Sequence, residues 1–382
     1  MLHNIKFEIN TSIISGQETL LRFLKDKPKK NMGIIVDKNL YRKSNYIKKC
    51  LIKAKTEATN IFIFYDYRFE PSYQYLDKIM NLIKKNKNFK KITNWIAIGG
   101  GSVMDTAKGI AVLSTNSGKS LNYRGFPENI KSPLPVICVP STTGTGSEVV
   151  YNASFIDEIS KVKMGINVKS NFPKLAILDP KVVSESPNSV LASSACDALV
   201  HTLESFVSSK SNKISRYFSI KAFNLIIKNA NILLKNRGNL ENWNNLQWGA
   251  VYAMWALSNS TSGPTGALSY YLGSNFKISH GIAGGMFIGK ISKFNHDSGY
   301  YDYADLLDQN NKKIKNKKQK SKEVVKIINT FLQNSYIPKS LSELGIKKSE
   351  FKGFYNFASK AKVAFNFNPI KIRKKDLKII IN

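Results

Sequence analysis

Asp197 and His201 stand four residues apart in the segment CDALVHTLESF, which has a helical pattern. On a helix, residues at this spacing project from the same face about one turn apart, so a carboxylate and an imidazole can reach the same point. A carboxylate oxygen and an imidazole nitrogen are suitable ligands for Fe(II) or Zn(II). Such a pair by itself is more often a surface hydrogen bond, so the spacing alone leaves both interpretations open.

A second candidate site begins at three consecutive glycines, Gly99, Gly100 and Gly101, in IAIGGGSVMDTAKGIAVL. Glycine permits a tight turn whose backbone N–H groups stay open to a phosphate, and a helix N-terminus favours an anion. We expect Ser102 to cap the following helix and to donate to a phosphate oxygen, with Asp105 as the acid of a capping box. The alternative is a plain strand-to-helix turn, because the pattern matches neither common phosphate-binding fingerprint.

A similar loop, VPSTTGTGSEVV from Val139 to Val150, follows another apolar run and supplies hydroxyl and backbone donors. Loops that follow strands of one parallel sheet meet beyond its carboxyl edge. The two loops together therefore predict one nucleotide-binding crevice.

The elements that must position these residues are visible as a change of pattern along the chain. Five short apolar runs, at 32–37, 61–66, 95–100, 135–140 and 175–180, alternate with helical segments. Runs of this kind indicate strands buried on both faces of a parallel sheet. After Pro180, long helical patterns replace them. We expect an α/β dinucleotide-binding domain at residues 1–184 and an all-α helical domain, carrying the metal and substrate site, at residues 185–382.

Composition narrows the class of partner. The chain has 382 residues and a formal net charge of +32, but its lysines are spread widely. The one dense run, Asn310 to Lys322, has no aromatic residue for base stacking, so we expect a solvated loop or helix face and no nucleic-acid partner. The charge favours anionic small molecules. No apolar run is long enough for a membrane span or a signal core, which predicts a cytoplasmic protein without a membrane partner.

Five motifs in this order resemble the iron-containing, or group III, alcohol dehydrogenase family of the dehydroquinate synthase-like superfamily. They are GGGSVMDTAK (99–108), PSTTGTGSEV (140–149), AILDP (176–180), DALVHTLES (197–205) and the HG of ISHGIAGG (278–285). The resemblance covers nearly the whole chain. It implies a Rossmann-like N-terminal domain, a helical C-terminal domain, and a cleft between them that holds a nicotinamide cofactor and a divalent metal. We also expect a homodimer.

The resemblance also assigns the cofactor site. The expected cofactor-binding residues are Asp37, Gly99, Gly100, Gly101, Ser102, Asp105, Thr142, Thr143, Ser147 and Lys163. Lys163 matches a family lysine near the nicotinamide ribose. Asp37 matches the acid that receives the adenosine ribose, where a carboxylate hydrogen-bonds the 2′-OH and repels a 2′-phosphate. This favours NAD over NADP, although the neighbouring Lys38 weakens the preference.

The resemblance implies a metal site with four ligand residues, and this chain has three of them. Asp197, His201 and His280 match, whereas the position fourteen residues before His280 holds Gly266. Three alternatives remain. In the first, Fe(II) or Zn(II) is bound by three side chains with water or substrate at the vacated position, as is common in catalytic zinc sites. In the second, the metal is lost and polar groups bind an anionic or polyhydroxy substrate. The third covers a ligand donated from elsewhere or an inactive protein.

The expected activity is NAD(P)-dependent interconversion of an alcohol and its aldehyde or ketone by metal-assisted hydride transfer. Tyr270 stands where the family has a further histidine, and is a candidate proton relay or simply a packing residue. We expect Gly266 to enlarge the pocket, a polar or anionic substrate such as a sugar-derived or phosphonate-bearing aldehyde, and tighter metal binding after Gly266→His. The alternatives are a sugar-phosphate cyclase of the dehydroquinate synthase type, a metal-independent reductase, and a non-catalytic binding protein.

Overall fold

The computed structural model describes residues 7–26, 30–67, 70–307 and 316–381. The chain divides into two compact units, one of Ile9–Pro187 and one of Asn188–Asn382 together with the segment that ends at Glu8. Among the described residues, no helix is both long and apolar enough to cross a membrane.

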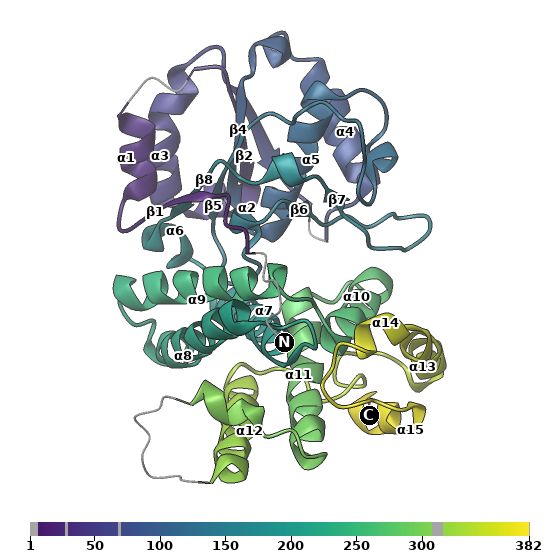
Figure 1. Cartoon of the computed structure of the whole chain (residues 1–382). Coiled ribbons are helices and arrows are strands. Elements are labelled where there is room, and N and C mark those ends of the chain that lie inside the picture. Colours follow the sequence, from purple (N-terminus) through teal and green to yellow (C-terminus); the bar gives the residue numbers. More distant parts are fainter. Residues whose placement is uncertain (1–6, 27–29, 68–69, 308–315, 382) are drawn as a thin grey trace. The chain divides into compact units, whose positions relative to one another are not determined.

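The Ile9–Pro187 unit contains a six-stranded, fully parallel sheet in the order β1-β8-β5-β4-β2-β3 (Figure 1). Its strands are β1 (Ser12–Ser15), β2 (Met32–Asp37), β3 (Ile61–Tyr65), β4 (Asn94–Gly99), β5 (Val136–Pro140) and β8 (Leu175–Leu178). The five predicted runs form the last five of these strands, which confirms the parallel α/β fold. The short edge strand β1 was not predicted, because four residues, SIIS, carry little pattern.

Helices cover both faces of this sheet, which explains why its strands are continuous apolar runs. They are α1 (Thr19–Lys25), α2 (Lys38–Lys43), α3 (Asn45–Thr56), α4 (Tyr73–Lys84), α5 (Gly101–Thr115) and α6 (Pro180–Val183). Leu20 of α1 and Leu51 of α3 belong to the core on one face, and Leu76 of α4 and Ile110 of α5 to the core on the other. A two-stranded antiparallel pair, β6 (Asn152–Ala153) and β7 (Ile166–Asn167), lies outside the main sheet.

The strand order reverses between β2 and β4. From β2 the chain continues outward to β3, whereas β4, β5 and β8 follow one another on the other side. In such sheets ligands bind beyond the carboxyl ends of the two strands at this reversal. Asp37 ends β2 and Gly99 ends the adjacent β4, so two of the predicted cofactor residues lie there.

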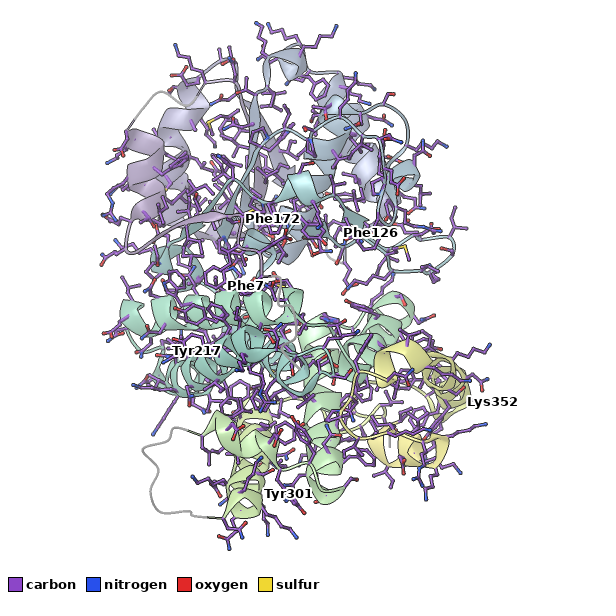
Figure 2. All side chains as sticks on the ribbon, viewed as in Figure 1. Phe7, Phe126, Phe172, Tyr217, Tyr301 and Lys352 are labelled. Atoms are coloured by element: carbon purple, nitrogen blue, oxygen red, sulfur yellow. The ribbon has the colours of Figure 1, made fainter. Side chains whose placement is uncertain are left out.

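In the second unit, the regular elements of the described residues are all helical, which confirms the predicted fold class. The helices are α7 (Asn188–Val207), α8 (Lys213–Asn236), α9 (Leu240–Ser258), α10 (Pro264–Phe276), α11 (His280–Asp297), α12 (Lys317–Asn334), α13 (Phe351–Lys360), α14 (Lys362–Phe365) and α15 (Lys374–Ile381). Phe7, labelled in Figure 2, stacks on Phe218 of α8 with ring centroids 5.5 Å apart, and it belongs to this helical unit. Residues 310–315 of the lysine-rich run lie outside the described residues, and its remainder forms the largely exposed first turn of α12.

Candidate active site

The close packing of α11 against α7 brings the predicted metal ligands together. Asp197 and His201 lie one turn apart on α7, and His280 is the first residue of α11. A Cβ at Gly281 would lie 1.9 Å from the backbone oxygen of Ser193 on α7, so only glycine allows this approach. The start of α11 is therefore held directly against the ligand-bearing face of α7.

The three side chains converge on a single point. The Nε2 atoms of His201 and His280 lie 3.7 and 3.9 Å from Asp197 Oδ1, and potential donor atoms of all three are within 4.8 Å of one another. Two ligand atoms bound to one tetrahedral ion at about 2.1 Å would be about 3.4 Å apart. Asp197 is 5% exposed, and its Oδ1 has no hydrogen-bond partner among the described residues. A buried carboxylate oxygen facing two imidazole nitrogens fits a divalent metal ion.

The surroundings of Gly266 contradict the expected enlargement of the pocket. A Cβ at this position, in the first turn of α10, would lie 2.2 Å from Ser262 Oγ and 3.2 Å from Glu204 Oε2. The Ser262 hydroxyl occupies this place because it donates to Glu204 Oε2 over 2.7 Å. The expectation of extra space at position 266 is therefore wrong.

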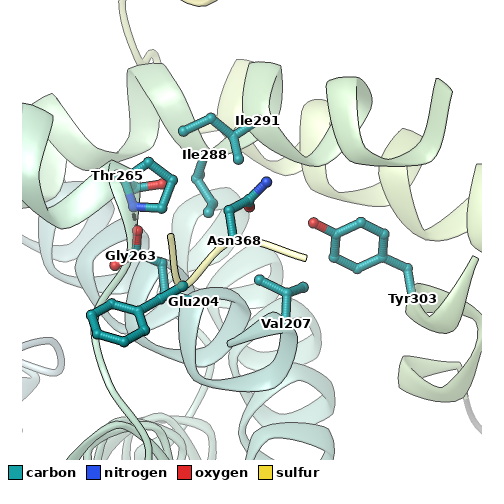
Figure 3. A pocket seen from close by; sticks show the side chains of 10 residues that line it. Glu204, Val207, Gly263, Thr265, Ile288, Ile291, Tyr303 and Asn368 are labelled. Atoms are coloured by element: carbon teal, nitrogen blue, oxygen red, sulfur yellow. Dashed lines mark hydrogen bonds between the residues drawn. The ribbon is translucent and has the colours of Figure 1, made fainter. Parts of the chain in front are cut away.

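Glu204, which was not predicted as a site residue, organises the start of α10. Its carboxylate is 3% exposed and accepts hydrogen bonds from the backbone N–H groups of Thr265 (2.6 Å; Figure 3) and Gly266 (3.1 Å). Gly263, the N-cap residue, has no side chain for this purpose. Glu204 also lines a cavity of about 10 Å³, which is room for about one water molecule. Its position one turn after His201 in the motif DALVHTLES was the available signal.

Tyr270 lies beside the three converging side chains. Its ring stacks on the His280 imidazole with centroids 5.0 Å apart and an interplanar angle of 21°, and the residue is 39% exposed. Tyr270 thus limits the orientation of one predicted ligand and also reaches solvent. This placement is compatible with both roles considered for it.

The two loops predicted to bind the dinucleotide lie against each other. The N–H of Ser141 donates to Gly99 O over 2.9 Å, and a Cβ at Gly100 would lie 3.2 Å from Thr142 Cγ2. Glycine at 100 and 101 therefore allows the turn before α5 to approach the loop after β5. Thr143, in the same loop, is buried.

The predicted capping box at α5 is wrong. Gly100 is the N-cap and Gly101 the first helical residue, so Ser102 is the second and Asp105 the fifth. A capping box needs its acid at the third helical position. The Asp105 carboxylate instead accepts hydrogen bonds from Ser147 Oγ (2.5 Å) and Ser154 N (2.9 Å).

A fully buried lysine, Lys108, ties this helix to the second loop and was also missed. Its ammonium donates to Ser147 O (2.6 Å), Ser147 Oγ (2.7 Å) and Asn152 O (2.9 Å), and lies 3.6 Å from Asp105 Oδ1. The hydroxyl of Ser147 is thus engaged inside the protein. Ser147 and Asp105 hold the loops together here, whatever else they contact.

The remaining predicted cofactor residues carry charged groups with defined partners. Asp37 accepts a hydrogen bond from Leu40 N over 2.7 Å and caps α2. The neighbouring Lys38 pairs with Asp66. Lys163, in the loop between β6 and β7, forms an ion pair with Glu70 at 2.9 Å.

Comparison with known proteins agrees with both halves of this description. Residues 10–180 match the family described as iron-containing alcohol dehydrogenase, and residues 191–382 match the C-terminal part of the Fe-containing alcohol dehydrogenase family. The chain belongs to the iron-containing alcohol dehydrogenase family. Enzymes of this family use a nicotinamide dinucleotide and a divalent metal, and the converging Asp197, His201 and His280 fit such an ion.

Two curated members of the iron-containing alcohol dehydrogenase family are 31% identical to this chain. Alcohol dehydrogenase 4 of Schizosaccharomyces pombe matches over 70% of this chain and 62% of its own length. The 4-hydroxybutyrate dehydrogenase of Clostridium kluyveri matches over 75% of each. The solved alcohol dehydrogenase from Oenococcus oeni has the same fold, with a TM-score of 0.86, 23% identity and 99% of both chains covered.

Proposed function

We propose that this protein is an NAD-dependent dehydrogenase that interconverts an alcohol and its aldehyde or ketone at a metal centre of Asp197, His201 and His280. The observation that carries the proposal is the convergence of two imidazole Nε2 atoms on the buried, unpartnered Oδ1 of Asp197. Family membership supports the reaction class.

A divalent ion in this centre supplies Lewis acidity toward the alcohol oxygen. The chain's own residues hold and orient the reacting groups. The packing of Gly281 against α7 and the stacking of Tyr270 on His280 keep the three ligand side chains in place. Bound NAD would supply the hydride acceptor in the oxidation direction, and the hydroxyl proton of the alcohol would need a separate acceptor. The partly exposed Tyr270 is our proposed carrier of that proton.

The dinucleotide would lie at the carboxyl edge of the sheet, with its pyrophosphate on Gly99, Gly100, Gly101 and Ser102 and its nicotinamide side near Thr142, Thr143 and Lys163. Asp37 ends β2 beside this edge, where its carboxylate favours NAD. The pairing of Lys38 with Asp66 supports that preference, because it offsets a neighbouring cation that would attract a 2′-phosphate.

A polar or anionic alcohol is the substrate class that we propose. The formal charge of +32 favours the approach of anions, and one relative at 31% identity is named for 4-hydroxybutyrate, a carboxylate-bearing alcohol. The homodimer expected from the sequence stays a prediction.

The deciding experiment combines metal analysis of the purified protein with NAD reduction measured on a panel of neutral and carboxylate-bearing alcohols, before and after chelation. We expect one divalent ion per chain, NADH formation, loss of activity in chelator and recovery on adding metal. Activity that persists in metal-free protein would contradict the metal centre. A carbocyclic product without net NADH would identify a cyclase, and cofactor binding without turnover a binding protein.

A further inference from the structure

Ser262 and Gly266 are matched in shape at the start of α10. Ser262 immediately precedes the N-cap, and its Oγ lies 2.2 Å from where a Cβ at position 266 would stand, closer than non-bonded heavy atoms approach. Its Cβ is 3.5 Å from the same point, an ordinary contact. The main obstacle to a side chain at 266 is therefore one hydroxyl oxygen, and Glu204 Oε2, at 3.2 Å, is a second, milder one.

Glu204 holds that hydroxyl in position. Ser262 Oγ donates to Glu204 Oε2 over 2.7 Å, while Glu204 Oε1 accepts the two backbone N–H groups at the start of α10. Rotating the hydroxyl away would remove a donor from a carboxylate that is 3% exposed, which is costly for a buried charge. Ser262 is not among the residues that line the cavity of about 10 Å³ beside Glu204.

Position 266 also lies near residues that contact or neighbour the candidate metal ligands. It lies one helical turn before Tyr270 on the same face of α10, and Tyr270 stacks on His280. On the other side it contacts Glu204, which lies one turn after His201 on α7. A side chain at 266 would thus start between the two histidine-bearing helices.

We propose that Ser262 sets the number of side-chain ligands at this metal centre. Its hydroxyl, oriented by Glu204, stands where a Cβ at position 266 would lie, so a side chain there is kept from the centre and three protein ligands remain. This inference rests on the proposed metal centre. Ser262→Ala removes the excluding atom and allows a histidine at 266 to become a fourth ligand.

The test is a set of four proteins, namely wild type, Ser262→Ala, Gly266→His and the double variant, freed of metal and titrated with Zn²⁺ against a chromophoric chelator. Gly266→His alone should bind Zn²⁺ no more tightly than wild type, and Ser262→Ala alone should leave the affinity within about twofold. The double variant should bind at least about tenfold more tightly than wild type. The visible absorption of bound Co²⁺ should change only in the double variant, because an added imidazole changes the ligand field.

A double-mutant cycle with alanine at 266 measures the steric conflict between residues 262 and 266 in the absence of metal. Gly266→Ala should lower the thermal unfolding temperature of the metal-free protein by more in the wild-type background than in the Ser262→Ala background, because the second background lacks the hydroxyl that the new Cβ would meet. Additive effects of the two changes, or tighter Zn²⁺ binding by Gly266→His alone, would overturn the role of Ser262. Coupled effects in the alanine cycle would also overturn it if the protein carrying both Ser262→Ala and Gly266→His binds Zn²⁺ no more tightly than wild type. Failure of the wild type to bind Zn²⁺ or Co²⁺ would instead overturn the proposed metal centre, and the alanine cycle would still report on the pairing.

Discussion

Glu148, in the short 3₁₀ turn Ser147–Val149 after β5, is a carboxylic acid buried within the second of the two loops predicted to bind the dinucleotide. Its burial raises the pKa of the carboxyl from 4.5 to about 7, although the nearby Lys108 ammonium lowers it in part. Burial penalises the ionised form of an acid, so the folded protein holds the proton more tightly than the unfolded chain does. Ionisation of Glu148 therefore opposes folding near neutral pH.

Glu148→Gln should remove this opposition. For a pKa raised on folding, the favourable contribution is complete below about pH 4.5 and is lost as the pH rises through about 7. Relative to the variant, the wild type should thus lose up to about 3 kcal/mol of unfolding free energy over this range. Urea unfolding at a series of pH values measures the difference. Glu128→Gln, at an exposed residue, is the control. If the unfolding free energy of Glu148→Gln varied with pH in parallel with that of the wild type, the prediction would be contradicted.

At the scale of elements, the junction between α7 and α11 decides whether a metal site exists. His280 and the α7 ligands are far apart in sequence, and they meet because Gly281 lets α11 begin in contact with Ser193 of α7. At Gly285, one turn later on α11, the atoms nearest to an added Cβ belong to the side chain of Ile337, at 3.2 Å or more. Comparing alanine at these two positions therefore distinguishes an effect on the contact between α7 and α11 from an effect of alanine on α11 alone.

Gly281→Ala should displace the start of α11, because its Cβ would lie 1.9 Å from a backbone oxygen. We expect unfolding free energy to fall by about 1–3 kcal/mol and Zn²⁺ affinity to fall about tenfold or more. Gly285→Ala should leave both nearly unchanged, since higher helix propensity of about 1 kcal/mol offsets its tight contact. Equal Zn²⁺ affinities of the two variants would show that this junction does not position His280.

At the scale of the whole molecule, charge is the dominant feature. The formal net charge is +32, from 58 Lys and Arg against 26 Asp and Glu. Lysine side chains extend outward over the described surface, as Lys352 of α13 does (Figure 2). A field of one sign increases the rate at which oppositely charged substrates arrive, and salt screens it.

For a carboxylate-bearing alcohol that the enzyme oxidises, kcat/KM should therefore fall as ionic strength rises from about 0.01 to about 0.15 M, where the screening length shortens from about 30 to about 8 Å. A neutral alcohol of similar size, assayed at saturating NAD, should change little and serves as the control. Steady-state rates at constant pH measure both. An equal salt response of the two alcohols would indicate that the charge does not act on substrate arrival.

Much of the fold and part of the site were predictable from the sequence. Strands buried on both faces must be apolar throughout, so β2 to β5 and β8 were visible as runs. The exact start of α5 was not, because three consecutive glycines allow several turns, and the prediction for Ser102 and Asp105 was wrong by two helical positions. Lys108 was missed because a buried lysine depends on acceptors that come from a distant loop.

The sequence by itself determined the family and the parallel sheet and predicted the three candidate metal ligands, since these depend on residue types and on spacing along single elements. Only the tertiary structure decided what stands at Gly266. The substitution of histidine by glycine suggests an empty space, but Ser262 and Glu204, 58 residues apart in sequence, fill it with a hydroxyl held by a buried carboxylate. That contact exists only because α7 packs against the start of α10, and no local pattern records the distance between two packed helices.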